Sequence, residues 1–398
     1  MKAVMTVTGC LLLLLVSACD EGTGPNNNFD RELDPQLVAQ GKEIFRFDSF
    51  GDEVYWSDTL RMHEVIESGV SPATALSVGL KVDSDALPQA LKDAIAAGQV
   101  DLNDPATTVA LLKLNAVLGV KGTVESVGGQ DRLVRVGITC ALCHSTVDNS
   151  FAPGIGRRLD GYANRSLNVG AIVALSPAVT PALRQILNSW GPGRYDPRIN
   201  FDNQNTPIVI PPAFGLRRVA RETFTGEGPV SYWNAYVAVT QMHGQGSFAD
   251  SRLGVNLVRN PDLVTPKLPA LAEYQFSLDA PAPPAGSFDP VAAERGRGLF
   301  NGVARCAECH DPANSFTDIN RGVLHAPSET GMDPAYAERT TQKRYRTTPL
   351  KGLWQHPPYF HDGSAADVAA VVAHYNATFG LQLTAQQQAD LAQYLKSL

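Results

Sequence analysis

Apolar residues recur at helical spacing in many short stretches of the chain, and Gly- and Pro-containing segments separate these stretches. In the first half, the spacing is clearest in three segments: 59–68, 88–97 and 105–118. An extended apolar run, 109–120, contains Lys113 and Asn115, so it predicts a buried helix of a soluble domain and not a membrane span. The pattern predicts a mostly α fold with short helices and long loops.

The C-terminal segment carries the signals of a final helix. Thr384 and Gln387 have the spacing of a capping box, in which two side chains satisfy backbone N–H groups of the first turn. The apolar residues that follow share one helical face: Leu391, Tyr394, Leu395 and Leu398.

One pattern occurs twice along the chain. Residues 33–45 align without gaps on residues 288–300, and both segments contain Asp-Pro, which is typical of a helix start. The tripeptide Asn-Ser-Phe also occurs twice in the same order, at 149–151 and 314–316. These landmarks predict two related domains that arose from an internal repeat.

The spacing of the landmarks predicts the domain boundaries. We expect a first domain at 31–278 and a second at 288–398, joined by a Pro-rich linker at 279–287. The first domain is longer because of an additional segment at 46–139, which carries the three helix-like stretches. We therefore expect a helical insertion that packs on the first domain.

Two copies of the motif C-x-x-C-H carry the clearest chemistry: Cys140, Cys143 and His144, then Cys306, Cys309 and His310. Two thiols at this spacing add to the two vinyl groups of one porphyrin, and the adjacent histidine binds the iron. A thioredoxin-like redox motif or half of a zinc site is the alternative, but neither requires a histidine directly after both copies. The motifs predict two covalent c-type haems in two cytochrome c-like domains, with His144 and His310 as proximal ligands.

The N-terminus has the form of an export signal. Lys2 precedes an apolar run at 11–15, which ends in Val-Ser-Ala before Cys19. This resembles a bacterial lipobox, so we expect a signal peptide at 1–18, a lipid-modified Cys19 and a flexible tether at 19–30. The alternative is ordinary cleavage nearby with Cys19 unmodified. The predicted location is the bacterial periplasm, with the lipid held in the inner or outer membrane.

Composition and charge limit the disulfides and the binding partners that we expect for this protein. Once Cys10 is removed with the signal and Cys19 is acylated, the remaining cysteines are those of the two haem motifs, so no structural disulfide is predicted. The formal net charge is −7, so neither nucleic acid nor an anionic membrane surface is an expected partner. The 44% apolar composition is ample for a large core.

The second half resembles the bacterial dihaem cytochrome c peroxidase family, which includes the MauG-type enzymes. From Cys309 the chain reads CHDPANSF, then Thr-Pro-Leu at 348–350 and PYFHDG at 358–363. The family characteristically shows CHDPxxxF, then TPxLRN, then a PYFHDG-like turn before a helix. The first half resembles the family more weakly.

The resemblance places the sixth ligand of the second haem on the helix that follows PYFHDG. The family spacing implies Tyr375, and its neighbour His374 is the alternative; Met332 and His325 are further candidates. No methionine lies on this helix, which departs from the peroxidases of the family. A tyrosinate or histidine ligand sets a lower reduction potential than methionine.

The resemblance also implies that the first haem is the peroxide-reducing one, with a glutamate near its open face. No glutamate stands there in this chain, but a helix expected from about 229 ends beside His243. His243 is an acid–base group, a ligand that closes the iron, as Met242 could also be, or a residue packed away from the iron. Glu227 is a second acid–base candidate, and the alternative is an ordinary loop carboxylate.

Other residues have weaker claims. The family often has a Trp between the haems in an FWDG turn, whereas this chain reads Phe-Thr-Gly at 224–226. Trp233 and Trp354 are candidates for a haem edge, or else core aromatics. Arg346 and Lys351 are candidates for haem propionates, or else surface charges.

Three function classes follow from these features. The first is an enzyme that reduces hydrogen peroxide or another small oxidant with electrons from a small periplasmic donor of cytochrome c or cupredoxin type. The second is a MauG-like or oxygenase-like oxidation of a protein or organic substrate, and the third is pure electron transfer. The missing Met and Trp count against a standard peroxidase. Calcium bridges the domains in relatives, so Ca²⁺ is a further candidate cofactor.

Overall fold

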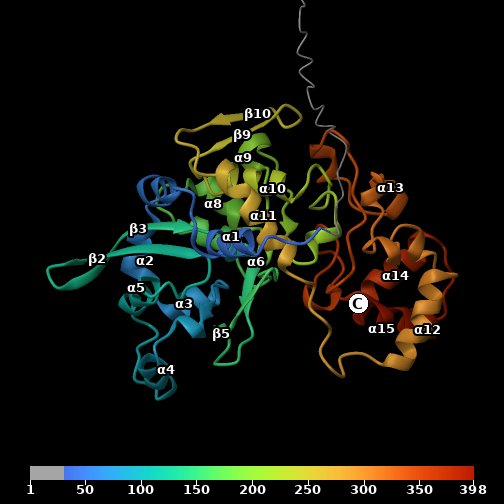
Figure 1. Ribbon diagram of the computed structural model, residues 1–398, viewed down its shortest axis with the longest axis horizontal. Helices are drawn as coiled ribbons and strands as arrows, with labels where there is room; N and C mark the ends of the chain where they lie inside the picture. Colours follow the sequence, from blue (N-terminus) through green and yellow to red (C-terminus); the bar gives the residue numbers. More distant parts are fainter. Residues whose placement is uncertain (1–30) are drawn as a thin grey trace, which may run out of the picture.

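The computed structural model describes residues 31–398, which form two lobes (Figure 1). The predicted signal peptide, the lipidated Cys19 and the tether lie outside the described residues. Within 31–398, no helix combines the length and the apolar character that crossing a membrane requires.

The first lobe runs from blue to yellow in Figure 1 and holds most of the elements. Its α-helices are α1 Pro35–Phe47, α2 Met62–Gly69, α3 Pro72–Ser77, α4 Gln89–Ala96, α5 Pro105–Lys113, α6 Ala141–His144, α7 Val169–Ala174, α8 Pro181–Asn188, α9 Ile199–Asp202, α10 Val230–Tyr236 and α11 Leu268–Ser277. The lobe also has two short π-helical segments, η1 Val54–Thr59 and η4 Val237–Gln241, and three 3-10 turns, η2 Ser84–Ala86, η3 Leu216–Arg218 and η5 Thr265–Lys267.

The strands of the first lobe form five separate two-stranded sheets. They are the parallel pair β1 Val82–Asp83 with β5 Ile155–Gly156, and the antiparallel pairs β2 Val120–Val127 with β3 Gln130–Ile138, β4 Ser145–Val147 with β6 Arg158–Asp160, β7 Arg194–Tyr195 with β8 Ile208–Val209, and β9 Ser247–Asp250 with β10 Val255–Val258. The prediction of a mostly α fold is therefore correct in its helices, but it omits these strands.

The insertion differs most from the prediction. Its helices α4 and α5 lie within the predicted segments and α2 extends one residue past its segment, to Gly69, but the helix predicted over 105–118 ends at Lys113. Asn115 has a left-handed backbone (φ 53°), so the chain turns there and Val120 begins strand β2. The interpretation of 109–120 as one helix is wrong beyond Lys113. The segment 46–139 is thus helical with a long β-hairpin, and not helical alone.

The second lobe, orange to red in Figure 1, is smaller and helical. It contains α12 Pro290–Asn301, α13 Pro327–Thr330, α14 Val368–Thr378 and α15 Ala385–Lys396. The capping box at Thr384 and Gln387 is confirmed, since both of its reciprocal hydrogen bonds are present. Leu391, Tyr394 and Leu395 are buried in the core of this lobe, as their shared helical face predicted.

The two segments aligned in the sequence make the same kind of contact. Helix α1 packs on α11 and α12 packs on α15, and each begins with an Asp N-cap and a Pro in the first turn. A Cβ at Gly41 would lie 1.9 Å from the carbonyl oxygen of Ala270, and one at Gly296 would lie 2.1 Å from that of Asp390. Glycine at both positions therefore permits backbone contact between helices. The internal repeat itself stays a prediction.

Ion pairs across the boundary hold the two lobes together. Arg339 of the second lobe pairs with Asp196 at 2.9 Å and with Asp202 at 2.7 Å, both in the first lobe. Arg346 pairs with Glu222 at 3.2 Å. Because Arg339, Asp196 and Arg346 are buried or nearly so, removing one partner would leave a buried charge without compensation.

We predict opposite effects for alanine at two glycines of α12. Gly296→Ala should destabilise the protein by about 1–3 kcal/mol or more, because its methyl group would overlap the backbone of α15. Gly298→Ala on the exposed side, where nothing lies within 4 Å, should stabilise it by about 0.5–1 kcal/mol through helix propensity. Urea unfolding of both variants measures the difference. Equal effects would contradict the close helix contact.

Candidate functional site

The first C-x-x-C-H motif lies on the short helix α6, at the inner end of strand β3. Gly119, with φ +74°, lets the hairpin approach this motif, because a Cβ there would lie 2.0 Å from the backbone nitrogen of Leu142. Burial raises the pKa of both Cys140 and Cys143 to about 12, so both are neutral thiols. Both thiols and His144 line one cavity.

His144 is oriented for binding a metal ion. Its Nδ1 donates a hydrogen bond to the carbonyl oxygen of Pro211 at 3.1 Å, which leaves Nε2 as the free ring nitrogen. Burial lowers the pKa of His144 to about 4, so the imidazole is neutral, the form that binds iron. A backbone partner on the second ring nitrogen is the usual way proteins fix a histidine ligand.

The cavity beside α6 has a volume of about 540 Å³, within the range of cofactor and ligand sites. Four buried donors in its wall lack any partner: Thr108 Oγ1, Thr223 Oγ1, Trp233 Nε1 and Arg346 Nε. Buried donors are ordinarily satisfied, so four in one cavity indicate a missing acceptor group. The two propionates of a haem bound to α6 would supply carboxylate oxygens. The residues therefore fit a c-type haem.

Two π-helical segments shape the wall where His243 lies. Tyr55 is on η1, and His243 follows η4 with a left-handed backbone (φ 65°). The two rings stack with centroids 3.6 Å apart and planes 14° apart, and both line the cavity. Burial, with a smaller contribution from Arg259, lowers the pKa of His243 to about 4, so it is a neutral imidazole. Isolated π-segments and left-handed non-glycine residues are frequent at functional sites.

The sequence missed the carboxylate that faces this cavity. Glu227, the predicted acid–base candidate, is buried in an ion pair with Arg198 at 2.5 Å, accepts from Thr225 at 2.8 Å, and is not part of the cavity wall. Glu222 does line the cavity, and burial raises its pKa to about 7 despite Arg346. The placement favours the loop-carboxylate alternative for Glu227. The available signal for Glu222 was its position just before the Phe-Thr-Gly turn.

Met242 and the two tryptophan candidates fall in different places. Met242 is buried, lines the cavity, and its carbonyl oxygen accepts a hydrogen bond from Trp56 Nε1 at 3.1 Å. Trp233 also lines the cavity. Trp354 instead donates to the carbonyl oxygen of Pro281 in the linker at 3.1 Å, and Lys351 is exposed.

The second C-x-x-C-H motif repeats the arrangement of the first. It begins with a 3-10 turn at Cys306–Glu308, and His310 Nδ1 donates to the carbonyl oxygen of Phe316 at 3.0 Å. His310 Nε2 is again left for a metal ion, and burial lowers the pKa of this histidine. The Asn-Ser-Phe landmark after the motif thus supplies the carbonyl that orients the proximal histidine.

Of the two predicted ligands on α14, the structure brings Tyr375 to the second motif. Its pKa is raised by burial first and then by the charges of Cys309 and Cys306, which places the phenol near both thiols. Its ring stacks on Phe379 at 5.6 Å. His374 is engaged elsewhere, since its Nε2 donates to the carbonyl oxygen of Thr330 at 2.9 Å.

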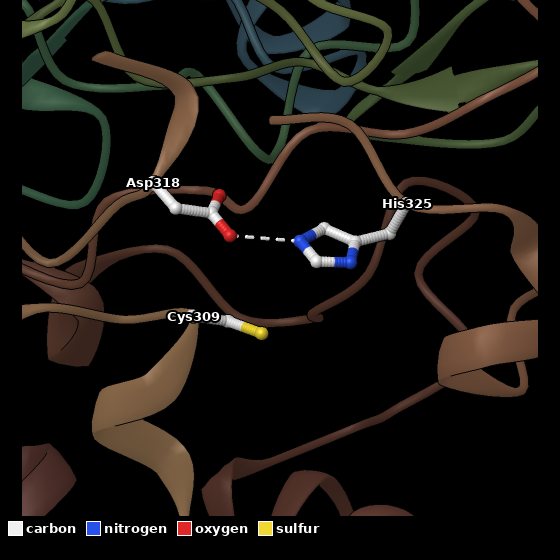
Figure 2. A group of neighbouring side chains, drawn as sticks. All are labelled: Cys309, Asp318 and His325. Atoms are coloured by element: carbon white, nitrogen blue, oxygen red, sulfur yellow. Dashed lines mark hydrogen bonds and ion pairs between the residues drawn. The ribbon is translucent and has the colours of Figure 1, made fainter. Parts of the chain in front are cut away.

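The remaining ligand candidates, His325 and Met332, also contact other side chains. Figure 2 shows Cys309, Asp318 and His325 close together, with His325 Nε2 bonded to Asp318 at 2.9 Å. His325 Nδ1 bonds Glu329 at 3.1 Å, so both ring nitrogens have partners. The hydrogen bond to Asp318, then that to Cys309, raises the pKa of His325 to about 10. Met332 packs against Tyr336 and its aromatic neighbours at the lobe boundary.

The cluster in Figure 2 bears on the calcium prediction. In the described part of the chain, Cys309, Asp318 and His325 are the one group of three acidic, Cys or His residues close enough to share a metal ion. Calcium requires six to eight oxygen ligands, and this group offers one carboxylate, one imidazole and a thiol. A thioether to haem would also remove the thiol. This group therefore does not fit Ca²⁺, and the binding of Ca²⁺ stays a prediction.

Comparison with known proteins supports the resemblance to the MauG-type dihaem family. The methylamine utilization protein MauG of Methylorubrum extorquens is 37% identical over 89 residues, which cover 21% of this chain and 24% of MauG. The chain thus matches about a quarter of that protein's length. No family profile matches the chain.

Two solved structures match about half of this chain at low similarity. Hydrazine synthase of Kuenenia stuttgartiensis has a TM-score of 0.35 at 18% identity, with coverage of 48% of this chain and 73% of that one. A MauG-like protein associated with microbial copper homeostasis also has a TM-score of 0.35, at 19% identity, with coverage of 49% and 74%.

We predict that Tyr375 and His374 differ in their effect on the second motif. Tyr375→Phe removes the buried phenol oxygen whose pKa responds to both Cys309 and Cys306, and it should change the visible and EPR spectrum of a haem bound at His310. His374→Gln, the neighbouring control, keeps a donor for the Thr330 carbonyl oxygen and should leave that spectrum unchanged. A spectral change in His374→Gln alone would show that His374, and not Tyr375, faces the haem.

Proposed function

We propose that the protein is a periplasmic dihaem c-type cytochrome that reduces hydrogen peroxide at the haem bound to His144. The observation that carries the proposal is the difference between the two distal sides. The first cavity presents the Tyr55–His243 pair, whose imidazole is neutral, whereas the second site has the phenol of Tyr375 next to its thiols. A first iron whose sixth position is open and a second iron whose sixth position is filled would suit a peroxidase that carries its own electron-transfer haem.

Haem c supplies an iron that exchanges electrons and, where its sixth position is open, binds small oxidants such as peroxide. His243 is placed to take a proton from one peroxide oxygen and return it to the other, because its neutral ring lines the same cavity as His144. Tyr55 holds that ring by stacking. Arg346, Trp233 and Thr223 would hold the propionates of a bound haem through their unpartnered donors.

The same proposal assigns a donor and a location. Two electrons and two protons convert one hydrogen peroxide into two waters, and a small cytochrome c or cupredoxin is the proposed class of electron donor in the periplasm. The lipobox at Cys19 would keep the protein at a membrane while the two lobes face the periplasm. Fractionation of cells, with acyl labelling at Cys19, tests this part separately from activity.

A MauG-like oxidation of another protein or of an organic molecule is the second candidate function. It is favoured by Tyr375, a residue type that the family places at this haem in its MauG-type members, and by the sequence match to MauG. Both functions use the first cavity as the site of the oxidant.

The intact protein is expected to carry two covalent haems. Cys140→Ser with Cys143→Ser should remove one haem mass, and Cys306→Ser with Cys309→Ser should remove the other. Intact-mass spectrometry of the periplasmic protein counts them directly. A single haem in the wild-type protein, or zinc in its place, would refute the dihaem proposal.

His243→Ala should slow peroxide reduction by about 10²-fold, the usual scale for losing a positioned acid–base group, with both haems retained. His63→Ala on α2 is the matched control, since His63 is not part of the cavity wall. Low-temperature EPR of the oxidised wild-type protein should show one high-spin and one low-spin haem. Two low-spin haems without peroxide turnover would establish the electron carrier instead.

A further inference from the structure

Arg165 carries two buried donor atoms without a partner, Nε and Nη1, more than any other side chain in residues 31–398. It lies in the first lobe, directly after Asn164, whose backbone N–H donates to the carbonyl oxygen of Cys143 at 2.9 Å. The wall of the cavity at the first motif does not include Arg165. A buried guanidinium is ordinarily paired with an acceptor, so a partner outside that cavity is missing.

The side chain of Arg165 acts on two residues of the second lobe, His356 and Tyr359. Burial first, and then the charge of Arg165, lowers the pKa of His356 to about 3. Burial raises the pKa of Tyr359 to about 12, and the charge of Arg165 opposes that rise. The ring centroid of His356 lies 6.1 Å from that of Phe214 in the first lobe and 6.0 Å from that of Tyr359 in the second. Arg165 therefore reaches the boundary between the lobes.

Two more polar atoms at this boundary lack partners, His356 Nδ1 and Gln355 Oε1. Gln355 ends the 3-10 turn η10 Leu353–Gln355, directly before His356. Uncharged groups of this kind are satisfied by a water molecule or by a ligand that carries a donor. A buried cation requires more, because its charge stays uncompensated without an anion. Arg165 thus determines the class of the missing group, an anion with oxygen acceptors such as a carboxylate.

Tyr359 links this boundary to the second motif. It is buried in the core of the second lobe together with Phe316, and Cys306 packs against the same core. The carbonyl oxygen of Phe316 is the acceptor that orients His310. A haem attached at this motif would therefore pack on the same core as Tyr359, the residue on which the charge of Arg165 acts.

The arginines beside the second motif already have carboxylate partners. Arg305 pairs with Glu308 at 2.7 Å, and Arg321 pairs with Asp311 at 3.0 Å. The two propionates of a haem at this motif therefore call for a cation from elsewhere. The first motif shows the same relation in the opposite direction, because Arg346 of the second lobe carries an unpartnered Nε in the cavity wall of the first lobe.

We propose that Arg165 binds a propionate of the haem at His310, so that each haem is held partly by an arginine of the opposite lobe. This rests on the proposed function in one respect, the haem bound at His310. The positive charge of Arg165 then stabilises the reduced form of that haem, in which the iron centre carries one positive charge less. A free carboxylate from solution would offer the same chemistry, and the experiments separate the two sources.

Potentiometric titration of the dihaem protein, followed by visible and EPR spectra, measures the reduction equilibrium of each haem. Arg165→Gln should shift this equilibrium toward the oxidised form by about tenfold for the haem at His310, or about 59 mV for one electron, because a buried positive charge is lost. The other haem should change by less than about twofold. Arg346→Gln should shift that other haem, which identifies it as the one at His144. If Arg346→Gln does not fold, removal of the first haem by Cys140→Ser with Cys143→Ser gives the same identification.

Two further variants separate the charge of Arg165 from a structural role. Arg165→Lys keeps the charge without the planar fork, so the equilibrium of the second haem should stay within about threefold of wild type. Arg157→Gln is the matched control in the same lobe, since its side chain is 70% exposed and pairs with Asp148 at 2.9 Å. It removes the same charge and should change neither haem by more than about twofold.

A measurement on the wild-type protein distinguishes the propionate from a free anion and does not depend on the folding of a variant. Acetate should neither bind saturably in calorimetric titration nor change the potential of the second haem when it replaces chloride at constant ionic strength, because the propionate already occupies Arg165. Saturable acetate binding that changes this potential would show a site for free anions and would overturn the proposal.

The variants give equally clear contrary results. An unchanged second haem in Arg165→Gln, a shift of the same haem by Arg165→Gln and Arg346→Gln, or an equal shift by Arg157→Gln would each overturn the role of Arg165. Peroxide turnover is not measured, so the outcome is separate from the proposed function. The expected shift in a protein that does not reduce peroxide would keep the role of Arg165 and reject the peroxidase, and turnover without the shift would do the reverse.

Discussion

The hydrogen bond from each motif histidine to a backbone carbonyl oxygen is the contact on which the rest of both sites depends. His144 donates to Pro211 and His310 donates to Phe316, and in each case Nε2 is left pointing away from the bond. The carbonyl belongs to a loop well separated from α6 in one lobe and close in sequence in the other. This bond fixes the plane of the imidazole. It would therefore also fix where Nε2 binds an iron, and so which residues face the sixth position of that iron.

Local signals in the chain were sufficient for the haem motifs, the Asp-Pro helix starts and the C-terminal capping box, since each depends on residues within a few positions of one another. The start of the β2–β3 hairpin was missed because the apolar run 109–120 continues from helix α5 to Val120, the first residue of β2, and the left-handed turn at Asn115 lies between the two elements. Glu222 was missed for a different reason. Its burial and its pairing with Arg346 join residues from opposite lobes, and no local pattern records such a contact.

The choice between Tyr375 and His374 shows what sequence spacing alone can assign and what it cannot. Neighbouring residues on a helix point about 100° apart, so the sequence placed two ligand types beside the second haem without separating them. The structure distinguishes Tyr375 from His374 by their different contacts. His374 is bonded to the carbonyl oxygen of Thr330, and Tyr375 lies among Phe360, Phe379 and the two thiols.

The lobe boundary completes the first site. Tyr336 and Arg346 of the second lobe line the cavity of the first, and Tyr336 is held between the guanidinium groups of Arg198 and Arg339, at 5.4 and 5.7 Å from its ring. Arg198 in turn pairs with Glu227, and Arg339 with Asp196. Relative motion of the lobes would break the ion pairs of Arg339 with Asp196 and of Arg346 with Glu222, and each break would leave a buried charge without its partner. The contacts that hold Tyr336 and Arg346 in the cavity wall therefore also restrain the separation of the two C-x-x-C-H motifs, as electron transfer between two bound haems would require.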